Sequence, residues 1–396
     1  MNAVAIVGAG ISGLLSAYYA AKRPECSRLR VYEARHSIGR PHCTGLVSEE
    51  TTSRIPFARR HVLHKYSSVR IMVPELRAEV NIAFEDCGII RIDRVKLENT
   101  LYQELLSLGV EVSLSDPVLA ISDQGSRWNV HSRRHTGEYD LLVLASGYNV
   151  RLVKSAGLSC KMEKMSGVQV ELETSSRLNI IDEDTVLVIL SKQFGGGFAW
   201  VVPTGVRALL AGCATAPNVI ESVKCLRLLL SVISRMTGGV KLSSKPFGGI
   251  VLRGYPIRPY SKKAMGIGDC VSMVKSLSGG GLYAISLVSR FVGPFVSQKY
   301  NLLREVRLLS KELKKQYFLA KAVQTVIRVA EAVGVEGLRL EIWSRGVSYD
   351  DHLGILYEVL SNKESLIALA RKKAVTLHID PARTRKKRHV FGSLLS

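Results

Sequence analysis

Three glycines near the N-terminus have the spacing of a turn that binds a dinucleotide. Gly8, Gly10 and Gly13 form a GxGxxG motif, which follows a short apolar run and opens a helical pattern. The first glycine permits a tight turn, the second lets the backbone approach a pyrophosphate, and the third allows close helix–strand packing. The helix N-terminus then offers free N–H groups and a partial positive charge. We therefore expect a nucleotide pyrophosphate at residues 8–13.

An acidic residue follows at the distance that such a motif requires. Glu33 ends the second expected strand, 20 residues after Gly13, where a carboxylate can accept hydrogen bonds from a ribose diol. An acid at this position disfavours a 2′-phosphate, which argues against NADP. The motif alone fits NAD and FAD equally. A purely structural glycine turn is the alternative, but a strand, a helix and an acid in register favour a nucleotide site.

A second glycine-rich segment lies far along the chain. Residues 266–270 read GIGDC, and residues 277–282 read LSGGGL. Three consecutive glycines at a helix start suit a place where a flat ring lies against bare backbone. Together with residues 139–147 (YDLLVLASG), these segments resemble the nucleotide-contacting strand and the GDA…P.TGGG signature of glutathione-reductase-like FAD proteins, in the branch that contains p-hydroxybenzoate hydroxylase and geranylgeranyl reductases. The resemblance spans most of residues 1–300 and implies FAD as the cofactor.

The resemblance also assigns FAD contacts to individual positions. In that family the aspartate binds the ribityl and pyrophosphate portion, a role that falls here on Asp269. The backbone next to the flavin ring would be that of Gly280, Gly281 and Leu282. The chain departs from the signature at Ser276, where proline is usual. The other implied FAD contacts are Gly8, Gly10, Ser12, Gly13, Glu33, Ala34, Arg40, Cys43, Thr44, Gly45, Arg94 and Ala120.

Two further segments resemble those of archaeal geranylgeranyl reductases in particular. Residues 40–48 (RPHCTGLVS) resemble the loop that passes close to the flavin in those enzymes. Residues 197–203 (GFAWVVP) resemble their YxWxFP substrate motif, with a valine where that motif has phenylalanine. The implied substrate contacts are Phe198, which replaces the tyrosine, together with Trp200 and Pro203. Loss of the tyrosine hydroxyl removes a polar group, so an apolar pocket is expected.

The implied reaction is reduction of isolated prenyl double bonds in geranylgeranyl groups of archaeal membrane lipid precursors, with hydride from N5 of reduced FAD. An isolated alkene is a poor hydride acceptor, so a proton donor or a strongly favourable electrostatic site must assist. Cys43 is the candidate catalytic residue, because a thiol with a pKa near ~8.5 stays mostly protonated at neutral pH. His42 is the alternative donor, and a buried, inert cysteine is the structural alternative for Cys43. The external reductant, NAD(P)H or ferredoxin, is left open because no second GxGxxG is seen.

Two other functions share these fingerprints. A FAD-dependent monooxygenase of the hydroxylase branch would carry both glycine-rich segments. A membrane-associated flavoprotein that passes electrons to quinone would also have a redox-active flavin. The loop at residues 40–48 and the motif at residues 197–203 favour the reductase.

The pattern of elements predicts an α/β fold with discontinuous domains. Residues 1–155 and 248–300 are expected to form a Rossmann-like FAD domain of the glutathione-reductase type. Residues 156–247 contain short β-rich runs separated by turn residues, which predicts an α+β substrate domain with an antiparallel sheet. Residues 301–396 are expected to be a basic helical region.

Composition limits the possible partners. The chain has 396 residues and a formal net charge of +21, but no nucleic-acid motif, so a nucleic-acid partner is not expected. Its seven cysteines include no CxxC pair, which argues against a zinc site or another metal centre and suits a reducing cytosol. No apolar run approaches the length of a transmembrane helix.

The basic residues gather toward the C-terminus. Residues 302–318 combine a helical pattern with five lysines or arginines, and residues 383–388 contain five more. A substrate with long prenyl chains would be reached at a bilayer, so we expect a cytoplasmic protein that attaches peripherally to an anionic membrane surface. A solvated tail without a partner is the alternative.

Overall fold

The nucleotide-binding half of the molecule is a parallel sheet begun by a βαβ unit. The computed structural model describes residues 1–84, 88–215, 217–334, 337, 339–344, 348–355 and 375–379. Five strands in the order β19-β12-β1-β2-β8 form this sheet, all pairs parallel. Their bounds are β1 (Asn2–Val7), β2 (Cys26–Tyr32), β8 (Glu111–Ser113), β12 (Leu141–Leu144) and β19 (Ala264–Gly266). Central strands β1 and β12 are continuous apolar runs because both of their faces are buried.

Helices and two small sheets surround this sheet. Helix α1 packs against α3 and α7. The helices of this half are α1 (Ile11–Ala21), α2 (Glu49–Arg54), α3 (Arg94–Ser107), α4 (Val150–Ser155), α6 (Leu282–Val288) and α7 (Val292–Val296). The small sheets are β3 (Leu46–Ser48) with β7 (Ile89–Ile92) and β4 (Val62–Tyr66), and β9 (Val118–Asp123) with β10 (Trp128–Ser132) and β11 (Thr136–Tyr139).

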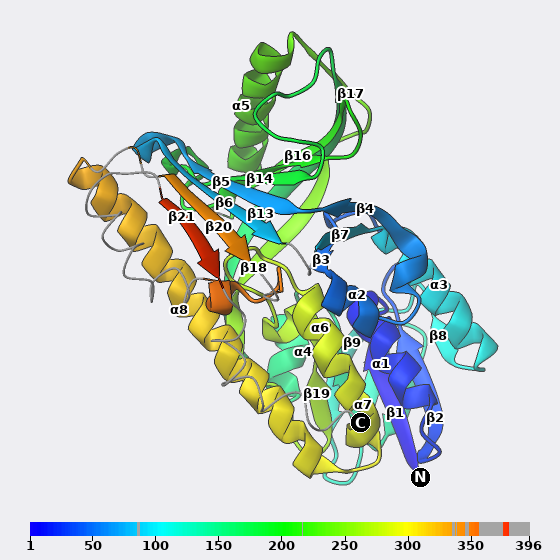
Figure 1. The fold of residues 1–396 in the computed structure, drawn as a ribbon. Helices are drawn as coiled ribbons and strands as arrows, with labels where there is room; N and C mark the ends of the chain where they lie inside the picture. The colour runs from blue at the N-terminus through cyan, green and yellow to red at the C-terminus, as the bar shows by residue number, and fades with distance from the viewer. Residues whose placement is uncertain are drawn as a thin grey trace.

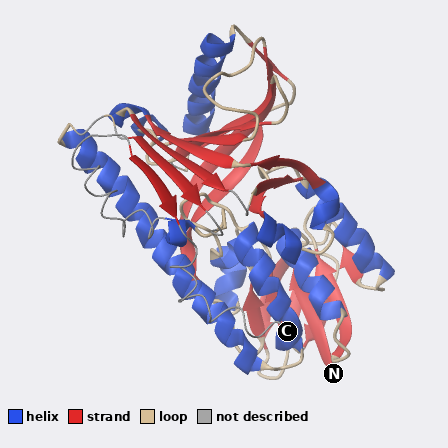
Figure 2. Cartoon of the chain, in the orientation of Figure 1, coloured by secondary structure: helices blue, strands red, loops and turns tan. Residues whose placement is uncertain are grey.

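The second half is a ten-stranded, mostly antiparallel sheet, as expected for the substrate region. Its order is β17-β13-β16-β15-β14-β5-β6-β20-β21, and β18 also pairs with β13. Figure 2 shows the strands of both halves in red. The strands are β5 (Ser68–Val73), β6 (Ala78–Phe84), β13 (Ser159–Thr174), β14 (Thr185–Ile189), β15 (Phe198–Pro203), β16 (Ala208–Thr215), β17 (Val240–Leu242), β18 (Phe247–Arg258), β20 (Arg339–Ser344) and β21 (Val375–Ile379). This sheet therefore takes strands from three separate parts of the chain.

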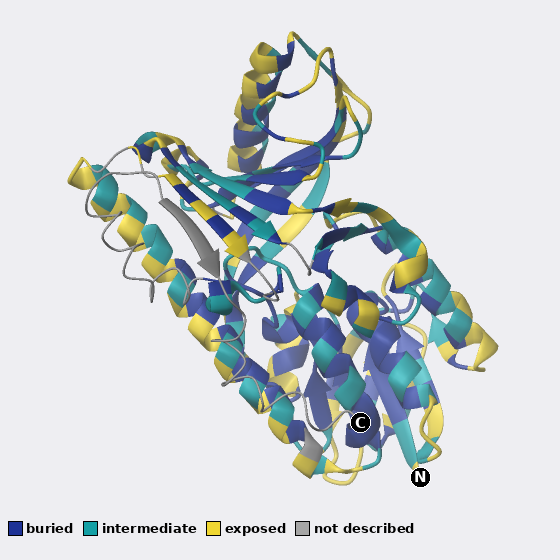
Figure 3. Cartoon of the chain, viewed as in Figure 1, coloured by how far each residue is buried: buried dark blue, intermediate teal, exposed yellow. Residues whose placement is uncertain are grey.

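Two helices complete the arrangement. Helix α5 (Val219–Thr237) covers one face of the large sheet, and the long α8 (Arg304–Ala332) runs from the nucleotide-binding half to the large sheet (Figure 1). Buried residues follow the strands and the inner helix faces, with separate apolar cores in the two halves (Figure 3). Within the described part of the chain, no helix is long and apolar enough to cross a membrane.

Candidate active site

The glycine turn after β1 is shaped by contacts that exclude side chains. A Cβ at Gly8, where φ is +102°, would lie 2.3 Å from the carbonyl oxygen of Ala145. A Cβ at Gly13 would lie 1.8 Å from the carbonyl oxygen of Gly8. Gly10 differs, because a Cβ there would meet no protein atom within 4 Å. Gly8 and Gly13 thus close the turn onto the end of β12, while Gly10 faces the space that a pyrophosphate would need.

Glu33 fixes the same turn from the end of β2. Its side chain is buried, and its two carboxylate oxygens accept hydrogen bonds from the backbone N–H of Ala9 (2.7 Å) and of Arg35 (2.9 Å). Each oxygen keeps a free lone pair, so the carboxylate can still accept from ribose hydroxyls.

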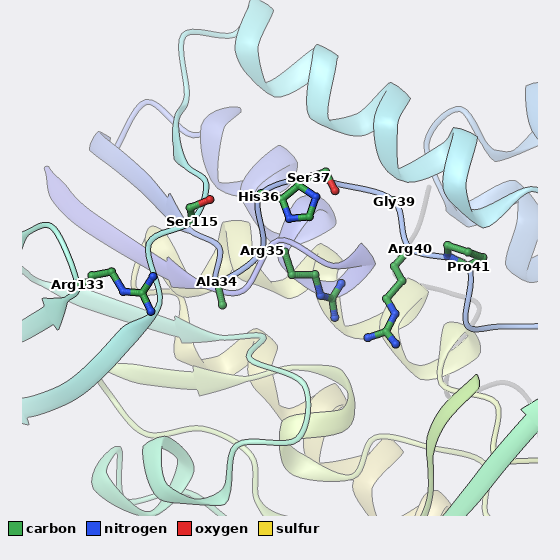
Figure 4. Close-up of a pocket in the computed structure, with 9 residues that line it drawn as sticks. All are labelled: Ala34, Arg35, His36, Ser37, Gly39, Arg40, Pro41, Ser115 and Arg133. Carbon is green, nitrogen blue, oxygen red and sulfur yellow. The ribbon is translucent and has the colours of Figure 1, made fainter. Parts of the chain in front are cut away.

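A basic opening lies next to Glu33. It has a volume of about 430 Å³ and is lined by Ala34, Arg35, His36, Ser37, Gly39, Arg40, Pro41, Ser115 and Arg133. Figure 4 shows the guanidinium groups of Arg35 and Arg40 extending to the same side of this segment. Such a set suits a phosphate-bearing nucleotide. Sequence reasoning found Ala34 and Arg40 but missed Arg133, which comes from beyond β10 and has no local signal.

The two glycine-rich segments meet although they are far apart in sequence. A Cβ at Gly268 would lie 2.3 Å from Oγ of Ser12, so the GD turn lies against the start of α1. A Cβ at Gly281, the residue before α6, would lie 3.6 Å from Oδ1 of Asp269. Gly280 precedes it, and Leu282 begins α6 with a buried side chain. The structure thus brings together both ends of the predicted FAD site.

Asp269 faces a recess rather than the outer surface. Its side chain is solvent-exposed, yet the surrounding protein raises its pKa by desolvation, and the charge of Arg94 opposes that rise. Solvent exposure together with a pKa raised by desolvation is what we expect of a carboxylate that lines an open space inside the protein. Asp269 therefore lies where the two glycine segments predict the cofactor.

Arg94 is the buried cation of this region. It begins α3 and forms an ion pair with Glu98. Burial lowers its pKa, but the charges of Glu98, Cys43 and Asp269 outweigh burial and raise it. Its Nε is buried and has no hydrogen-bond partner among the described residues. An unsatisfied buried donor next to Asp269 is a good position for a bound polar group.

Cys43 lies in an exposed loop beside Arg94. It is not buried, which removes the alternative of an inert core cysteine. The N–H of Gly45 contacts its Sγ at 3.4 Å, and Gly45, with φ +80°, passes so close to Ile92 that a Cβ would lie 2.4 Å from the Ile92 carbonyl oxygen. Desolvation and Arg94 lower the pKa of neighbouring His42, so its imidazole is neutral at pH 7. A neutral imidazole is a poor acid, which favours Cys43 as the proton donor.

Gln169 joins the Cys43 loop to the large sheet. Its buried Oε1 accepts hydrogen bonds from Oγ1 of Thr44 (3.1 Å) and from Nε1 of Trp200 (3.3 Å). The indole lies over Gly212, where a Cβ would be 2.5 Å from the Trp200 ring. Sequence reasoning missed Gln169. The only available signal was one amide between two valines on a strand.

Two predicted positions, Pro203 and Ala120, lie away from the other site residues. Phe198 and Trp200 share one face of β15, with ring centroids 5.6 Å apart. By alternation along the strand, Pro203 falls on the other face, and its carbonyl accepts a hydrogen bond from the Tyr66 hydroxyl at 2.6 Å. Ala120 is exposed on β9, where it pairs with His131, and the contacts of the described residues do not join it to the glycine turn.

Comparisons with known proteins agree with this geometry. Residues 6–65 match the model of the NAD(P)-binding Rossmann-like domain. Digeranylgeranylglycerophospholipid reductase 2 of Methanopyrus kandleri is 23% identical over 74% of this chain and 76% of its own. Digeranylgeranylglycerophospholipid reductase of Methanocaldococcus jannaschii is 20% identical over 80% of this chain and 84% of its own.

Solved structures show the same fold. A geranylgeranyl bacteriochlorophyll reductase-like protein of Thermoplasma acidophilum superposes with a TM-score of 0.71 at 16% identity, covering 94% of this chain and 99% of that one. The chain is thus similar, at low identity, to proteins named as geranylgeranyl-type reductases. Halogenase PltM, solved with phloroglucinol and FAD, has a TM-score of 0.61 at 11% identity, covering 85% of this chain and 77% of its own. The predictions of a Rossmann-like fold and of FAD as cofactor are confirmed, and the protein is a flavin-dependent oxidoreductase.

Two glycine substitutions should separate cofactor binding from folding. Gly10→Ala adds a methyl group that touches no protein atom, so the urea unfolding midpoint of the apoprotein should stay unchanged while FAD affinity falls about tenfold or more. Gly13→Ala drives a methyl group into the Gly8 carbonyl and should destabilise the apoprotein by about 2 kcal/mol or more. Tight FAD binding by the Gly10→Ala protein would place the pyrophosphate elsewhere.

Asp269→Ala should weaken FAD retention without unfolding the protein. The substitution removes an acceptor that faces the recess, so FAD affinity measured by fluorescence titration should fall about tenfold or more. Asp182→Ala is the control, since Asp182 is exposed and pairs with Arg177. Equal FAD affinity in the two variants would remove Asp269 from the site.

Proposed function

We propose that the protein uses FAD to reduce isolated prenyl double bonds in geranylgeranyl groups of membrane lipid precursors. The observation that carries the proposal is the exposed Cys43 loop, hydrogen-bonded through Gln169 to the Trp200 side of an apolar sheet face. Relatives named digeranylgeranylglycerophospholipid reductase support the substrate class. NAD(P)H or ferredoxin is the proposed external reductant.

Cys43 donates the proton in this proposal. Bound, reduced FAD would supply a hydride to one alkene carbon, and the Cys43 thiol would protonate the other carbon. Because Cys43 is exposed, solvent can return the proton to the thiolate that remains. Proton donation by a positioned side chain is expected to contribute substantially to the rate.

The large sheet supplies the wall for the prenyl chain. Phe198 and Trp200 present adjacent rings on the face that carries Gln169. Because Gln169 accepts the indole N–H, Trp200 is held in one orientation and has no unsatisfied donor toward an apolar ligand. Such a wall can orient an alkene and exclude water from the reacting carbons.

The mass of the product tests the reaction. Anaerobic incubation of the reduced holoprotein with a digeranylgeranylglyceryl phosphate should yield products heavier by two hydrogens per reduced double bond. A product that gains oxygen in air would indicate a hydroxylase, and a product that gains halogen when both air and halide are present would indicate a halogenase, whose fold the chain also shares. An unchanged lipid with quinone-dependent flavin reoxidation would indicate an electron carrier.

Cys43→Ala should impair turnover and not stability. Because Cys43 is exposed, the free energy of unfolding should change by no more than about 0.5 kcal/mol. Alkene reduction should fall about tenfold or more with FAD still bound, because the proton donor is gone. Cys26→Ala, which removes a thiol from β2, is the matched control. Normal turnover in the Cys43→Ala protein would exclude the catalytic role.

Peripheral attachment to an anionic membrane is also proposed, with a correction. The apolar residues of the stretch 302–318, Leu303, Val306, Leu309 and Leu313, are buried in the protein core and are not free to insert into lipid. The basic cluster at residues 383–388 lies outside the described residues. Attachment would therefore depend on charge, at about 1 kcal/mol per basic side chain near the surface.

A liposome co-sedimentation assay tests this attachment. Binding should require anionic lipid, weaken at high salt and fall when residues 382–396 are deleted. Equal binding to neutral liposomes, or full binding after the deletion, would exclude the tail as the anchor.

A further inference from the structure

A buried ion pair lies directly behind the second glycine turn. Lys275 and Asp350 are each no more than 2% exposed, and the ammonium group pairs with Oδ1 of Asp350. Neither residue has a role in the reaction proposed above. A charged pair taken out of water is costly to assemble, and removal of one partner leaves an uncompensated charge.

Lys275 belongs to the turn that is predicted to contact the flavin. Its N–H donates to the carbonyl of Gly280 (3.0 Å), and its own carbonyl accepts from the N–H of Gly279 (2.8 Å). A Cβ at Gly280 would lie 3.2 Å from Cε and 3.9 Å from Nζ of Lys275. The ammonium group therefore lies against the backbone of this turn, on the protein side.

Asp350 connects that turn to the segment that follows the Cys43 loop. Its Oδ2 accepts hydrogen bonds from the N–H of Ser48 (2.9 Å) and from Oγ1 of Thr51 (2.6 Å), at the start of α2. Tyr349, the residue before Asp350, has its ring centroid 5.0 Å from Nζ of Lys275. A short segment from beyond β20 thus supplies the anion that joins both sides of the site.

We propose that Lys275 and Asp350 are positioning residues that hold the glycine turn and the Cys43 loop in register and keep the protein behind the flavin electrically neutral. The charges act through the turn, so the flavin senses any imbalance between them. The attraction of Lys275 and the hydrogen bonds from Ser48 and Thr51 outweigh burial and lower the pKa of Asp350, which keeps this carboxylate ionised. The inference rests on the FAD site and not on the identity of the substrate.

Flavin midpoint potentials of charge-deleting variants test the proposal. Asp350→Asn leaves a buried cation beside the turn, which favours the more negative reduced flavin and should raise the potential. Lys275→Gln leaves an anion and should lower it. The double variant restores neutrality and should return to the wild-type potential. The titrations are made on FAD-loaded protein at pH 8, so that His352, whose pKa is lowered by burial and by the charge of Lys275, is neutral.

A control separates this role from simple stabilisation. Lys224→Gln removes an exposed lysine, paired with Glu221 on α5, and should leave the potential unchanged. The proposal would be overturned if the midpoint potentials of the two single variants shifted in the same direction, or if single variants that bind FAD showed no shift in potential. If a single variant does not fold, two further results would overturn the proposal. One is a double variant whose midpoint potential differs from that of the wild type, and the other is a Lys275→Arg variant whose potential differs from it.

Discussion

The site depends on places where the backbone leaves no room for a side chain. At Gly8, Gly13 and Gly268 an added Cβ would overlap an atom of another segment: Ala145, Gly8 and Ser12 respectively. These three contacts bring the end of β1, the start of α1, the end of β12 and the GD turn to one point. A dinucleotide site can then be built from segments more than 200 residues apart in the chain. Gly10 lies among them with open space in front of it, which is where a ligand fits.

A second constraint joins this site to the large sheet. Gln169 has one carbonyl oxygen, and it accepts from Thr44 on the loop side and from Trp200 on the sheet side. Because the amide is buried, loss of either donor would leave a polar group with fewer partners. Gln169 therefore ties the Cys43 loop to the apolar wall. The ion pair of Lys275 with Asp350 adds a comparable link from the C-terminal segment.

Local patterns could be predicted from the sequence and distant pairings could not. The glycine turn, Glu33 and the role of Asp269 follow from short motifs with a physical meaning. Gln169 and Asp350 carry no such motif, since their partners lie 125 and 75 residues away. Strands β5, β6 and β20 join the large sheet by long-range pairing, which periodicity does not specify. The basic helical stretch at residues 302–318 suggests a membrane-facing helix, but the same period also suits a helix packed on a core, and its residues Val306, Leu309 and Leu313 are buried in that core.

The most direct test of the account is an anaerobic single turnover of the reduced holoprotein with a geranylgeranyl lipid, followed by flavin absorbance. The account predicts that the lipid alone reoxidises the flavin, that one double bond is saturated per flavin oxidised, and that Cys43→Ala slows this step without releasing FAD. A flavin that stays reduced with the lipid, and reoxidises only when oxygen or quinone is added, would contradict it.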